Sequence, residues 1–345
     1  MIRLRRIHIL VPGLAGWPQC REGLNRHRAG EVAALVTWCR RGRRNDGLPA
    51  GLENTLAYWA RIPVQSKQDL PVAAISRYGE EKHVAGGGYW LRCDPVHFNA
   101  EHSGVRLLDV EPDTIDHHEA KGLTDAIAAL YREEGWQVFP LAGQRWYLRL
   151  PTPPPLMTTP LYEVAGQAID DVLPGGPAQR QWRQILTEIQ MVLHRHAINE
   201  QRQQQGRPVI NGVWFWGGGE SPEVGPLPWQ TVTSDEPFAI GLARCSKVPA
   251  AVITGGAERV IDTLEQDALV VVSALRPAVS RQTWPLWWRQ LRRVHDLWLV
   301  PLVEALRRGR VDELNLFDGS GRVFTLTRRR LHFFWSRNGL ESLLQ

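Results

Sequence analysis

Apolar runs and amphipathic stretches alternate along the first part of the chain. Residues 7–11 form an apolar run that stops at Pro12 and Gly13, which predicts a buried strand followed by a turn. Apolar positions then recur at helical spacing over 31–39 and 52–59, so we expect two helices there. A strand followed by helices is typical of an α/β core.

The middle of the chain has a different pattern, with short alternating runs between longer amphipathic stretches. It predicts strands over 89–92, 106–110, 137–140 and 145–150. It also predicts helices over 119–131 and 182–194 and a proline-rich linker over 151–155. We therefore expect a smaller α+β domain over 85–205, inserted between two core halves at 1–84 and 206–345.

The last third returns to buried-strand patterns. Apolar runs predict strands over 209–216, 250–254 and 268–273, and a hairpin that joins 314–317 to 323–326. Tryptophan and leucine repeat at helical spacing from Trp284 to Leu302. This stripe predicts a buried helix face in preference to a ligand platform.

Bulk composition narrows the class of protein. The 345 residues are 43% hydrophobic and 22% charged, as in globular proteins, and no apolar run is long enough to span a bilayer. The four cysteines are widely spaced without a CxxC pair, so neither a zinc site nor a disulfide framework is predicted. The N-terminal segment is predicted to be a strand and not an export signal, which favours a cytoplasmic location.

Positive charge is the other compositional feature. The chain has 41 basic and 36 acidic residues, a formal charge of +5, with arginine clusters at 40–44 and 328–330. Guanidinium groups suit phosphate, so these clusters are candidates for phosphate or nucleic acid. No helix-turn-helix, RNP or zinc-finger motif accompanies them, so solvated loops are favoured and a nucleic-acid partner is not expected.

The densest group of polar residues follows the helix predicted over 182–194. If that helix continues, His196, Asn199 and Arg202 stand three residues apart on one stripe. An imidazole, an amide and a guanidinium on one face suit a small anion such as a carboxylate or phosphate. A solvated polar face is the alternative on spacing alone. Three glycines at 217–219 allow either a phosphate-binding loop or a tight turn packed on the core.

Several of these segments together resemble a known enzyme family. His196–Arg202, followed by Gly206, Pro208, Asn211 and the run 214–219, is similar to the H-P-x-N-x-x-R…G…A-N…W-G-x-G pattern of archaeal-type cofactor-independent phosphoglycerate mutases. Segments 94–99 and 145–148 resemble two further strands of those enzymes. The family belongs to the alkaline phosphatase superfamily. The resemblance therefore implies an α/β fold, an alkaline-phosphatase-like three-layer core split by an inserted smaller α+β domain.

A second likeness extends over nearly the whole chain. Segments 188–194 and 211–219 match the E-I-Q-M-x-x-H and N-x-x-W-x-W-G-G-G runs of RpfE-type bacterial proteins. Those proteins are named for the regulation of pathogenicity factors and are often labelled phosphoglycerate mutase. This resemblance implies a regulatory function.

The catalytic motifs of the mutases are missing from the matching positions. Val11-Pro12-Gly13 stands where their first strand ends in a metal-binding D-G, and 69–74 lacks the serine nucleophile of their S-D-x-A turn. The segment 272–281 has no carboxylate where they carry H-x-x-x-x-D-x-x-G-H, and Asp318-Gly319-Ser320 replaces D-H-x-T. A pair of divalent ions needs several such ligands, so we expect no metal cofactor. Arg276 and Arg281 suggest that arginine supplies positive charge there instead.

Three hypotheses follow. The first is an RpfE-like, catalytically degenerate regulatory protein that binds a small anionic metabolite, possibly phosphorylated, or a protein partner. In it Arg145 and Arg202 hold the anion, His196 and Asn199 orient it, and Asn211, Gly217 and Gly219 complete the site. The alternative is an active cofactor-independent phosphoglycerate mutase or phosphotransferase with relocated catalytic groups and a divalent metal. A third reading, an arginine-rich nucleic-acid binder, lacks the binding motifs.

Overall fold

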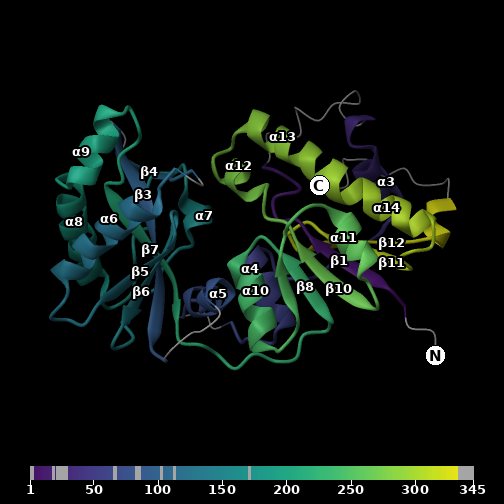
Figure 1. Ribbon diagram of the computed structural model, residues 1–345, viewed down its shortest axis with the longest axis horizontal. Coiled ribbons are helices and arrows are strands. Elements are labelled where there is room, and N and C mark those ends of the chain that lie inside the picture. Colours follow the sequence, from purple (N-terminus) through teal and green to yellow (C-terminus); the bar gives the residue numbers. More distant parts are fainter. Residues whose placement is uncertain are drawn as a thin grey trace. The chain divides into compact units, whose positions relative to one another are not determined.

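The computed structural model describes residues 4–17, 20, 30–64, 68–81, 87–101, 104–111, 114–169 and 172–332. The chain divides into two compact units, one formed by 1–63 with 223–345 and the other by 64–222 (Figure 1). We call them the split unit and the inserted unit. Among the described residues, no helix combines the length and the apolar character that crossing a bilayer requires.

The split unit contains a seven-stranded sheet in the order β2-β12-β11-β1-β10-β8-β9. Its strands are β1 (Arg6–Leu10), β2 (Arg43–Asp46), β8 (Thr231–Ser234), β9 (Ala250–Val252), β10 (Asp267–Val271), β11 (Glu313–Phe317) and β12 (Arg322–Thr327). Strand β1 lies at the centre and runs parallel to both β10 and β11. The parallel strands β11, β1, β10 and β8 therefore end at a common carboxyl edge, where open α/β sheets bind their ligands.

Helices pack on both faces of this sheet. They are α3 (Ala33–Arg41), α4 (Leu52–Trp59), α10 (Pro237–Cys245), α11 (Ala257–Asp262), α12 (Arg276–Ser280), α13 (Trp284–Val294) and α14 (Val300–Arg307), with the π-helical turn η1 (His295–Leu299) and the 3₁₀ turn η2 (Arg329–His332). Ile7 and Ile9 face the main core, which includes Trp38 and Trp287. The other face carries His8 against the rings of Phe317 and Trp229.

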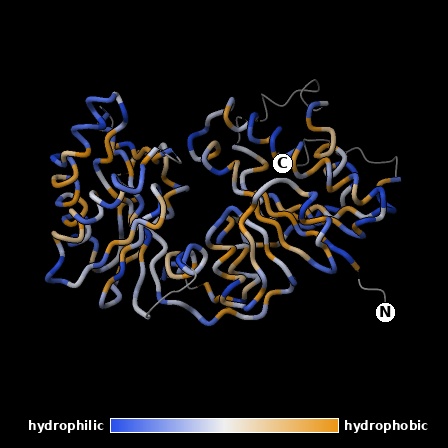
Figure 2. The backbone as a smooth tube through the Cα atoms, viewed as in Figure 1, coloured by the Kyte–Doolittle hydropathy of each residue, from blue (hydrophilic) through white to orange (hydrophobic). Residues whose placement is uncertain are grey.

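The tryptophan and leucine stripe is a buried helix face, as predicted. Trp287, Leu291, Trp298 and Leu302 are buried in the main core, while Trp284 packs beside them half-buried. The apolar segments in Figure 2 likewise concentrate in the strands of the sheet. The core of the split unit is therefore assembled from both ends of the chain.

The inserted unit is built on an antiparallel sheet. Its strands are β3 (Tyr89–Glu101), β4 (Gly104–Asp109), β5 (Gln137–Ala142), β6 (Arg145–Leu150) and β7 (Gly212–Gly219). Their order is β4-β3-β6-β5, and β7 pairs with β3. Its helices are α5 (Val72–Glu80), α6 (His117–Leu130), α7 (Leu161–Val164), α8 (Gln179–His194) and α9 (Ala197–Gln204). Helices α6 and α8 supply Leu123 and Ile189 to the apolar core on one face of the sheet.

The inserted unit is longer than the 85–205 predicted from the sequence. Strand β7 pairs antiparallel with β3 over residues 212–219, and α5 contacts both of these strands. Both segments therefore fold with the inserted unit, although each was assigned to a core half. The predicted boundary at 84/85 falls within 82–86, outside the described residues. The apolar run at 209–216 looked like a core strand because periodicity does not identify a strand's partner.

Candidate functional site

The predicted polar stripe depended on a continuous helix, and the structure contains a break instead. Helix α8 ends at His194 and α9 begins at Ala197. His196 is the residue that caps α9, and its Nδ1 accepts a hydrogen bond from the N–H of Ile198 at 3.2 Å. His196 therefore does not share a helical stripe with Asn199 and Arg202, and its Nδ1 stabilises a helix terminus.

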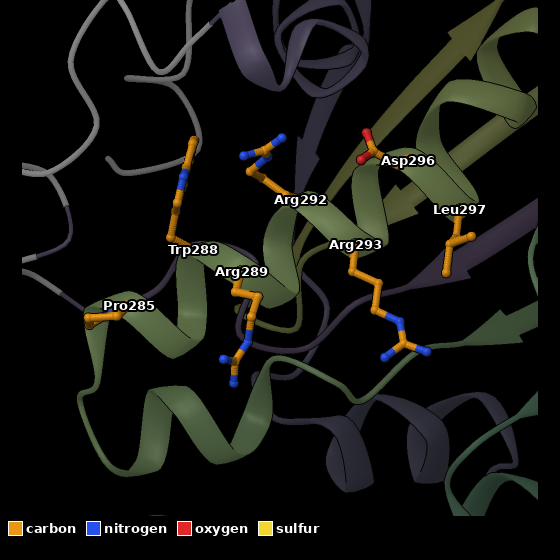
Figure 3. Close-up of a pocket in the computed structure, with 7 residues that line it drawn as sticks. All are labelled: Pro285, Trp288, Arg289, Arg292, Arg293, Asp296 and Leu297. Carbon is orange, nitrogen blue, oxygen red and sulfur yellow. The ribbon is translucent and has the colours of Figure 1, made fainter.

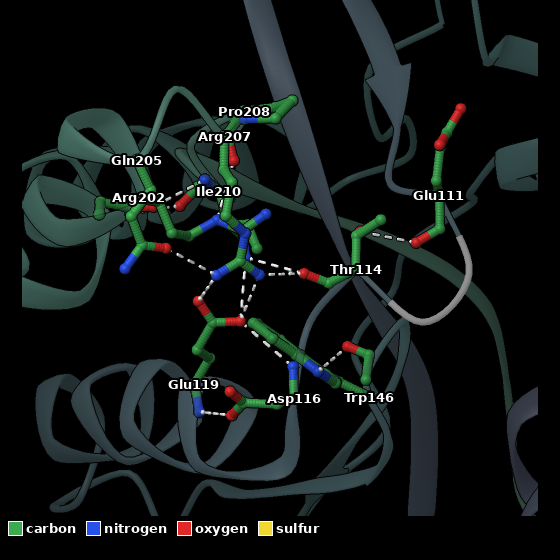
Figure 4. Close-up of polar contacts among 12 residues, drawn as sticks. Glu111, Thr114, Asp116, Glu119, Trp146, Arg202, Gln205, Arg207, Pro208 and Ile210 are labelled. Carbon is green, nitrogen blue, oxygen red and sulfur yellow. Dashed lines mark hydrogen bonds and ion pairs between the residues drawn. The ribbon is translucent and has the colours of Figure 1, made fainter.

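Arg202 is buried among protein acceptors, with 1% of its surface exposed. Its Nε donates to the carbonyl of Pro208 at 2.8 Å, and its Nη1 donates to the carbonyl of Thr114 and to Glu119 Oε2, both at 3.0 Å (Figure 4). Arg207 binds both oxygens of Glu119 from the other side, at 2.9 and 3.0 Å. Arg202 therefore closes a buried ion pair between α9 and α6.

Glu119 also forms part of the N-terminus of α6. Its backbone N–H donates to Asp116 at 2.8 Å, and its carboxylate accepts from the N–H of Asp116 at 3.2 Å. This reciprocal pair is a capping box, so one carboxylate serves both the helix start and the two arginines.

The two asparagines of the motif bind backbone groups. Asn199 donates to the carbonyls of Leu193 and Ile210 and accepts from the N–H of Ile210, each at 2.7 Å. Asn211 accepts from the N–H of Phe98 at 2.7 Å and donates to its carbonyl at 2.9 Å. Both Asn199 donors are occupied, and each amide ties α9 or β7 to a neighbouring segment.

Arg145 and the glycine run are also engaged within the inserted unit. Arg145 forms an ion pair with Glu80, which also accepts from the hydroxyl of Tyr147. The N–H of Gly217 donates to Thr158 Oγ1 at 3.1 Å, and the N–H of Gly218 to Asp69 Oδ2 at 3.3 Å.

The glycine run is also closely packed. A Cβ added to Gly219 would approach Pro71 Cβ at 2.5 Å, so only glycine fits without rearrangement. The run is thus the closely packed end of strand β7 and not the predicted loop or turn, and two of its N–H groups already have acceptors.

These contacts indicate that the recognisable motif holds the inserted unit together. The residues proposed from sequence, Arg145, His196, Asn199, Arg202, Asn211, Gly217 and Gly219, bind backbone groups or carboxylates or pack tightly in several separate places. The structure does not gather them around one opening. Their role in anion binding stays a prediction, and their geometry favours a structural role.

The carboxyl edge of the parallel sheet in the split unit offers a second group of polar residues. Val11 and Pro12 follow β1, and neither has a carboxylate. Asp318 follows β11 and is buried, with 1% of its surface exposed. Its oxygens accept from the N–H and hydroxyl of Ser320, both at 2.8 Å, and from Arg322 Nε at 2.7 Å. Asp318 therefore closes the β11–β12 hairpin.

Arg276 lies between two carboxylates at this edge. Its Nη2 donates to Glu53 Oε1 at 2.8 Å and its Nη1 to Glu236 Oε1 at 3.0 Å. The side chains of Glu53 and Arg276 are 5% and 14% exposed, so solvent screens their ion pair only partly. The second oxygen of Glu53 is buried and has no partner among the described residues. The guanidinium thus supplies the positive charge between the two glutamates.

Asp235, next to Glu236, has the carboxyl group with the most strongly shifted pKa at this edge. Both of its oxygens accept from the N–H of Ser273, at 2.9 and 3.1 Å. Although the side chain keeps an exposed surface, desolvation by surrounding atoms raises the pKa of Asp235 to about 6, and the charge of Glu236 adds to this. A carboxyl group with such a pKa is partly protonated below neutral pH.

The residues at this edge do not fit a divalent metal. Asp318 and Asp235 are engaged by backbone amides, and Glu53 and Glu236 by Arg276. Over the described residues, no group of three or more His, Cys, Asp and Glu side chains is arranged to hold a metal ion. A metal site needs several converging oxygen or imidazole ligands, which this arrangement lacks.

The position of the mutase nucleophile is equally changed. Asp69 accepts from the N–H of Thr158 at 3.0 Å, from the Thr158 hydroxyl, and from the N–H of Gly218. Burial raises the pKa of this carboxyl group. Asp69 is thus an acceptor that fixes the glycine end of β7, and no serine lies between Asp69 and Ala74.

Comparison with known proteins gives a fold and a set of relatives. A solved structure of a protein from Pyrococcus horikoshii covers 100% of this chain and 93% of its own, with a TM-score of 0.55 and 12% identity. The phosphoglycerate mutase structure from Thermoplasma acidophilum has a TM-score of 0.45 at 13% identity. The predicted mixed α/β fold is confirmed: one unit, built from both ends of the chain, contains a mainly parallel sheet, and the other contains an antiparallel sheet.

The sequence itself is similar to 2,3-bisphosphoglycerate-independent phosphoglycerate mutases. The enzyme of Methanosarcina barkeri is 27% identical over 53% of this chain and 45% of its own length. A probable mutase of Geobacter sulfurreducens is 26% identical over 64% of this chain and 57% of its own. The chain thus spans about half the length of these curated relatives. No protein-family model matches it.

The comparisons confirm the predicted relationship to the mutases in its coarse form. The finer likeness to RpfE-type proteins stays a prediction. Sequence reasoning identified Arg276 but missed its partners, because Glu53 lies 223 residues away and looks like an ordinary polar position in an amphipathic helix. The run Asp235-Glu236 after an apolar strand was the available signal for the strand-end carboxylates.

Proposed function

We propose that this protein is a catalytically degenerate relative of the cofactor-independent phosphoglycerate mutases and works as a regulatory binding protein of the RpfE type. Its ligand is either a small anionic metabolite or a protein partner. We favour a phosphorylated metabolite. Binding without phosphoryl transfer distinguishes this function from that of the mutases to which the chain is similar.

The observation that carries the proposal is the engagement of every carboxylate described at the sheet edge. Arg276 binds Glu53 and Glu236, and Arg322 binds Asp318. Divalent ions in phosphoryl transfer bind through free oxygens and neutralise the charge of the transferred group. Here arginines pair with Glu53, Glu236 and Asp318, and Asp235 accepts from Ser273, so the edge offers few free oxygens for such ions.

The changed nucleophile position adds independent support. A covalent route requires an activated hydroxyl, thiol or carboxylate aimed at the phosphorus. Asp69 is bound by Thr158 and Gly218 in the turn where the resemblance implies a serine. The missing nucleophile and the missing free metal ligands together favour a protein that binds its ligand but does not catalyse phosphoryl transfer.

The test is a coupled assay for interconversion of 3-phosphoglycerate and 2-phosphoglycerate. Wild-type protein is assayed with manganese and with excess chelator, beside an active cofactor-independent mutase as positive control. We expect no turnover above the protein-free background in either condition. A cooperative unfolding transition in the same sample verifies that the assayed protein is folded.

The alternative gives the opposite result. An active mutase with relocated catalytic groups would show turnover with manganese that the chelator abolishes. Such turnover, at a rate comparable with the positive control, would overturn the proposed function.

A further inference from the structure

Helix α13 is fixed on the core of the split unit by one face. Trp287, Leu291 and Val294 are buried there, and Trp287 donates its Nε1–H to the carbonyl of Gly13 at 2.9 Å. These positions lie four and three residues apart, so they share one side of the helix. The opposite side of α13 is therefore held in a defined orientation toward solvent.

The outer side of α13 borders a hollow of about 500 Å³ (Figure 3). Its lining includes Trp288, Arg289, Arg292, Arg293, Asp296 and Leu297. Arg289 and Arg293 stand one helical turn apart and point to the same side of the helix in the close-up. All of these residues belong to α13 and η1, so the hollow is open to solvent along one side of the helix.

The positive charge in this hollow is only partly compensated. Arg292 pairs with Glu31 at 3.1 Å. Asp296 lies 2.8 Å from Nδ1 of His295, which donates because Nε2 of the same ring accepts from the N–H of Ala34.

Two guanidinium groups are left without a protein acceptor. Throughout the described ranges, Arg289 and Arg293 have no hydrogen bond or ion pair with another residue. Two uncompensated like charges one turn apart repel each other. An anion placed between them would remove this repulsion.

The helix dipole does not explain this arrangement. Helix α13 continues through η1 into α14 without leaving the helical conformation, so Arg289 and Arg293 lie far from the carboxyl end of the helix at Arg307. The dipole stabilises a cation only within the last turn.

We propose that Arg289 and Arg293 bind the phosphate dianion of a small phosphorylated metabolite in the hollow of α13. Two guanidinium groups match its charge and supply directed N–H donors to its oxygens. The proposal rests on the proposed function, because it locates the anionic ligand of that function. It also assigns the ligand to residues other than Arg202 and Asn199, whose hydrogen bonds go to protein acceptors inside the inserted unit.

The experiment measures binding by calorimetry at low ionic strength with full-length protein. The probes are 3-phosphoglycerate, inorganic phosphate and glycerate, which lacks the phosphate. The variant is R289A/R293A. The matched control is R307A/R308A, which removes the same charge from α14, where both arginines pair with Glu304.

We expect the wild type and R307A/R308A to bind 3-phosphoglycerate and inorganic phosphate with similar affinity, and glycerate more weakly. R289A/R293A should bind the phosphates roughly tenfold more weakly or worse, because each charge-assisted hydrogen bond is strong. R289K/R293K, which keeps the charge without the planar fork, should be intermediate.

Three outcomes would overturn the site: no phosphate binding by the wild type, unchanged binding by R289A/R293A, or equal loss in R307A/R308A. These results are separate from the test of the proposed function. Manganese-dependent turnover would overturn the absence of catalysis and leave the α13 site standing. Unchanged phosphate binding by R289A/R293A would contradict the α13 site, while the proposed absence of turnover would be unaffected.

Discussion

Charged side chains in the recognisable motif of the inserted unit have different surroundings from charged side chains in the split unit and from Arg77 in α5, whose buried Nη1 has no partner among the described residues. In the inserted unit, Arg202 and Arg207 converge on Glu119, and each bond of Arg202 ends on a protein acceptor. In the split unit, Glu53 keeps one buried oxygen without a partner, and Arg289 has no acceptor among the residues that the structure describes. The closed network belongs to the recognisable motif, whereas the open groups lie outside it.

This difference separates two reasons for a sequence to resemble a family. A polar residue that closes a buried network is required by the fold, because an unpaired charge in the interior is costly. A residue that binds metal or substrate is required only by the chemistry. The chain has residues of the first kind in and next to α9 and β7. At Pro12 and Asp69 it differs from the mutase motifs that it resembles.

Replacing Arg202 should have the largest effect on stability and therefore tests this difference most strongly. Replacing it with alanine leaves Glu119 without its buried partner and opens a cavity, so we expect a loss of about 3–5 kcal/mol in the free energy of unfolding. Arg207→Ala is the matched control. It removes a partner of the same carboxylate from a side chain that is 36% exposed, so its loss should stay within about 1 kcal/mol.

Urea unfolding followed by circular dichroism measures both losses in the full-length protein. Equal losses for the two variants would show that burial does not distinguish the arginines. A small loss for Arg202→Ala, combined with weaker binding of a phosphorylated ligand, would return Arg202 to the anion-binding role predicted from the sequence.

Local patterns predicted much of this fold. The helix expected over 182–194 is α8 at Gln179–His194, and the buried face around Trp287 and Leu291 follows from helical spacing. These features depend on neighbours along the chain. The break at Arg195 was missed because a capping histidine and a helical histidine look alike in a sequence.

The site could not be predicted in the same way because its contacts are non-local. Glu119 lies 83 residues from Arg202, and Glu53 lies 223 residues from Arg276. A motif identifies which side chains have hydrogen-bonding capacity, but only the fold shows whether a backbone carbonyl or a ligand fills it. Strand β7 was likewise assigned to the wrong unit because its pairing with β3 leaves no local signal.

Acid should destabilise the split unit through His8, which lies in its central strand β1. Desolvation, partly opposed by the charge of Asp267, lowers the pKa of His8 to about 4, below its unfolded value of 6.5. The unfolded chain therefore binds the extra proton first. Stability is lost as pH falls from about 6.5 to 4, by up to about 3 kcal/mol.

The variant His8→Phe isolates this effect, because phenylalanine fits beside Phe317 and Trp229 without titrating. Urea unfolding at pH 7.5 and 4.5 should show a smaller acid loss for His8→Phe than for the wild type. The same acid loss in both proteins would mean that His8 titrates normally and that other groups set the acid sensitivity.

The smallest expected effect concerns Asp235, and its sign is opposite. The folded pKa of about 6 lies above the ordinary value of 3.8, so the folded protein binds the proton more tightly. This contribution favours folding at low pH and is lost as pH rises from about 4 to 6. Because Asp235 keeps an exposed surface, we expect this contribution to the free energy of unfolding to be less than about 1 kcal/mol and to disappear in Asp235→Asn.

Carbon-13 NMR titration of the aspartate carboxyl groups measures the pKa of Asp235 directly. A value near 3.8 would show that the strand-end edge is as well solvated as the protein surface, and the contrast between the two units would then rest on Glu53 and the arginines of α13.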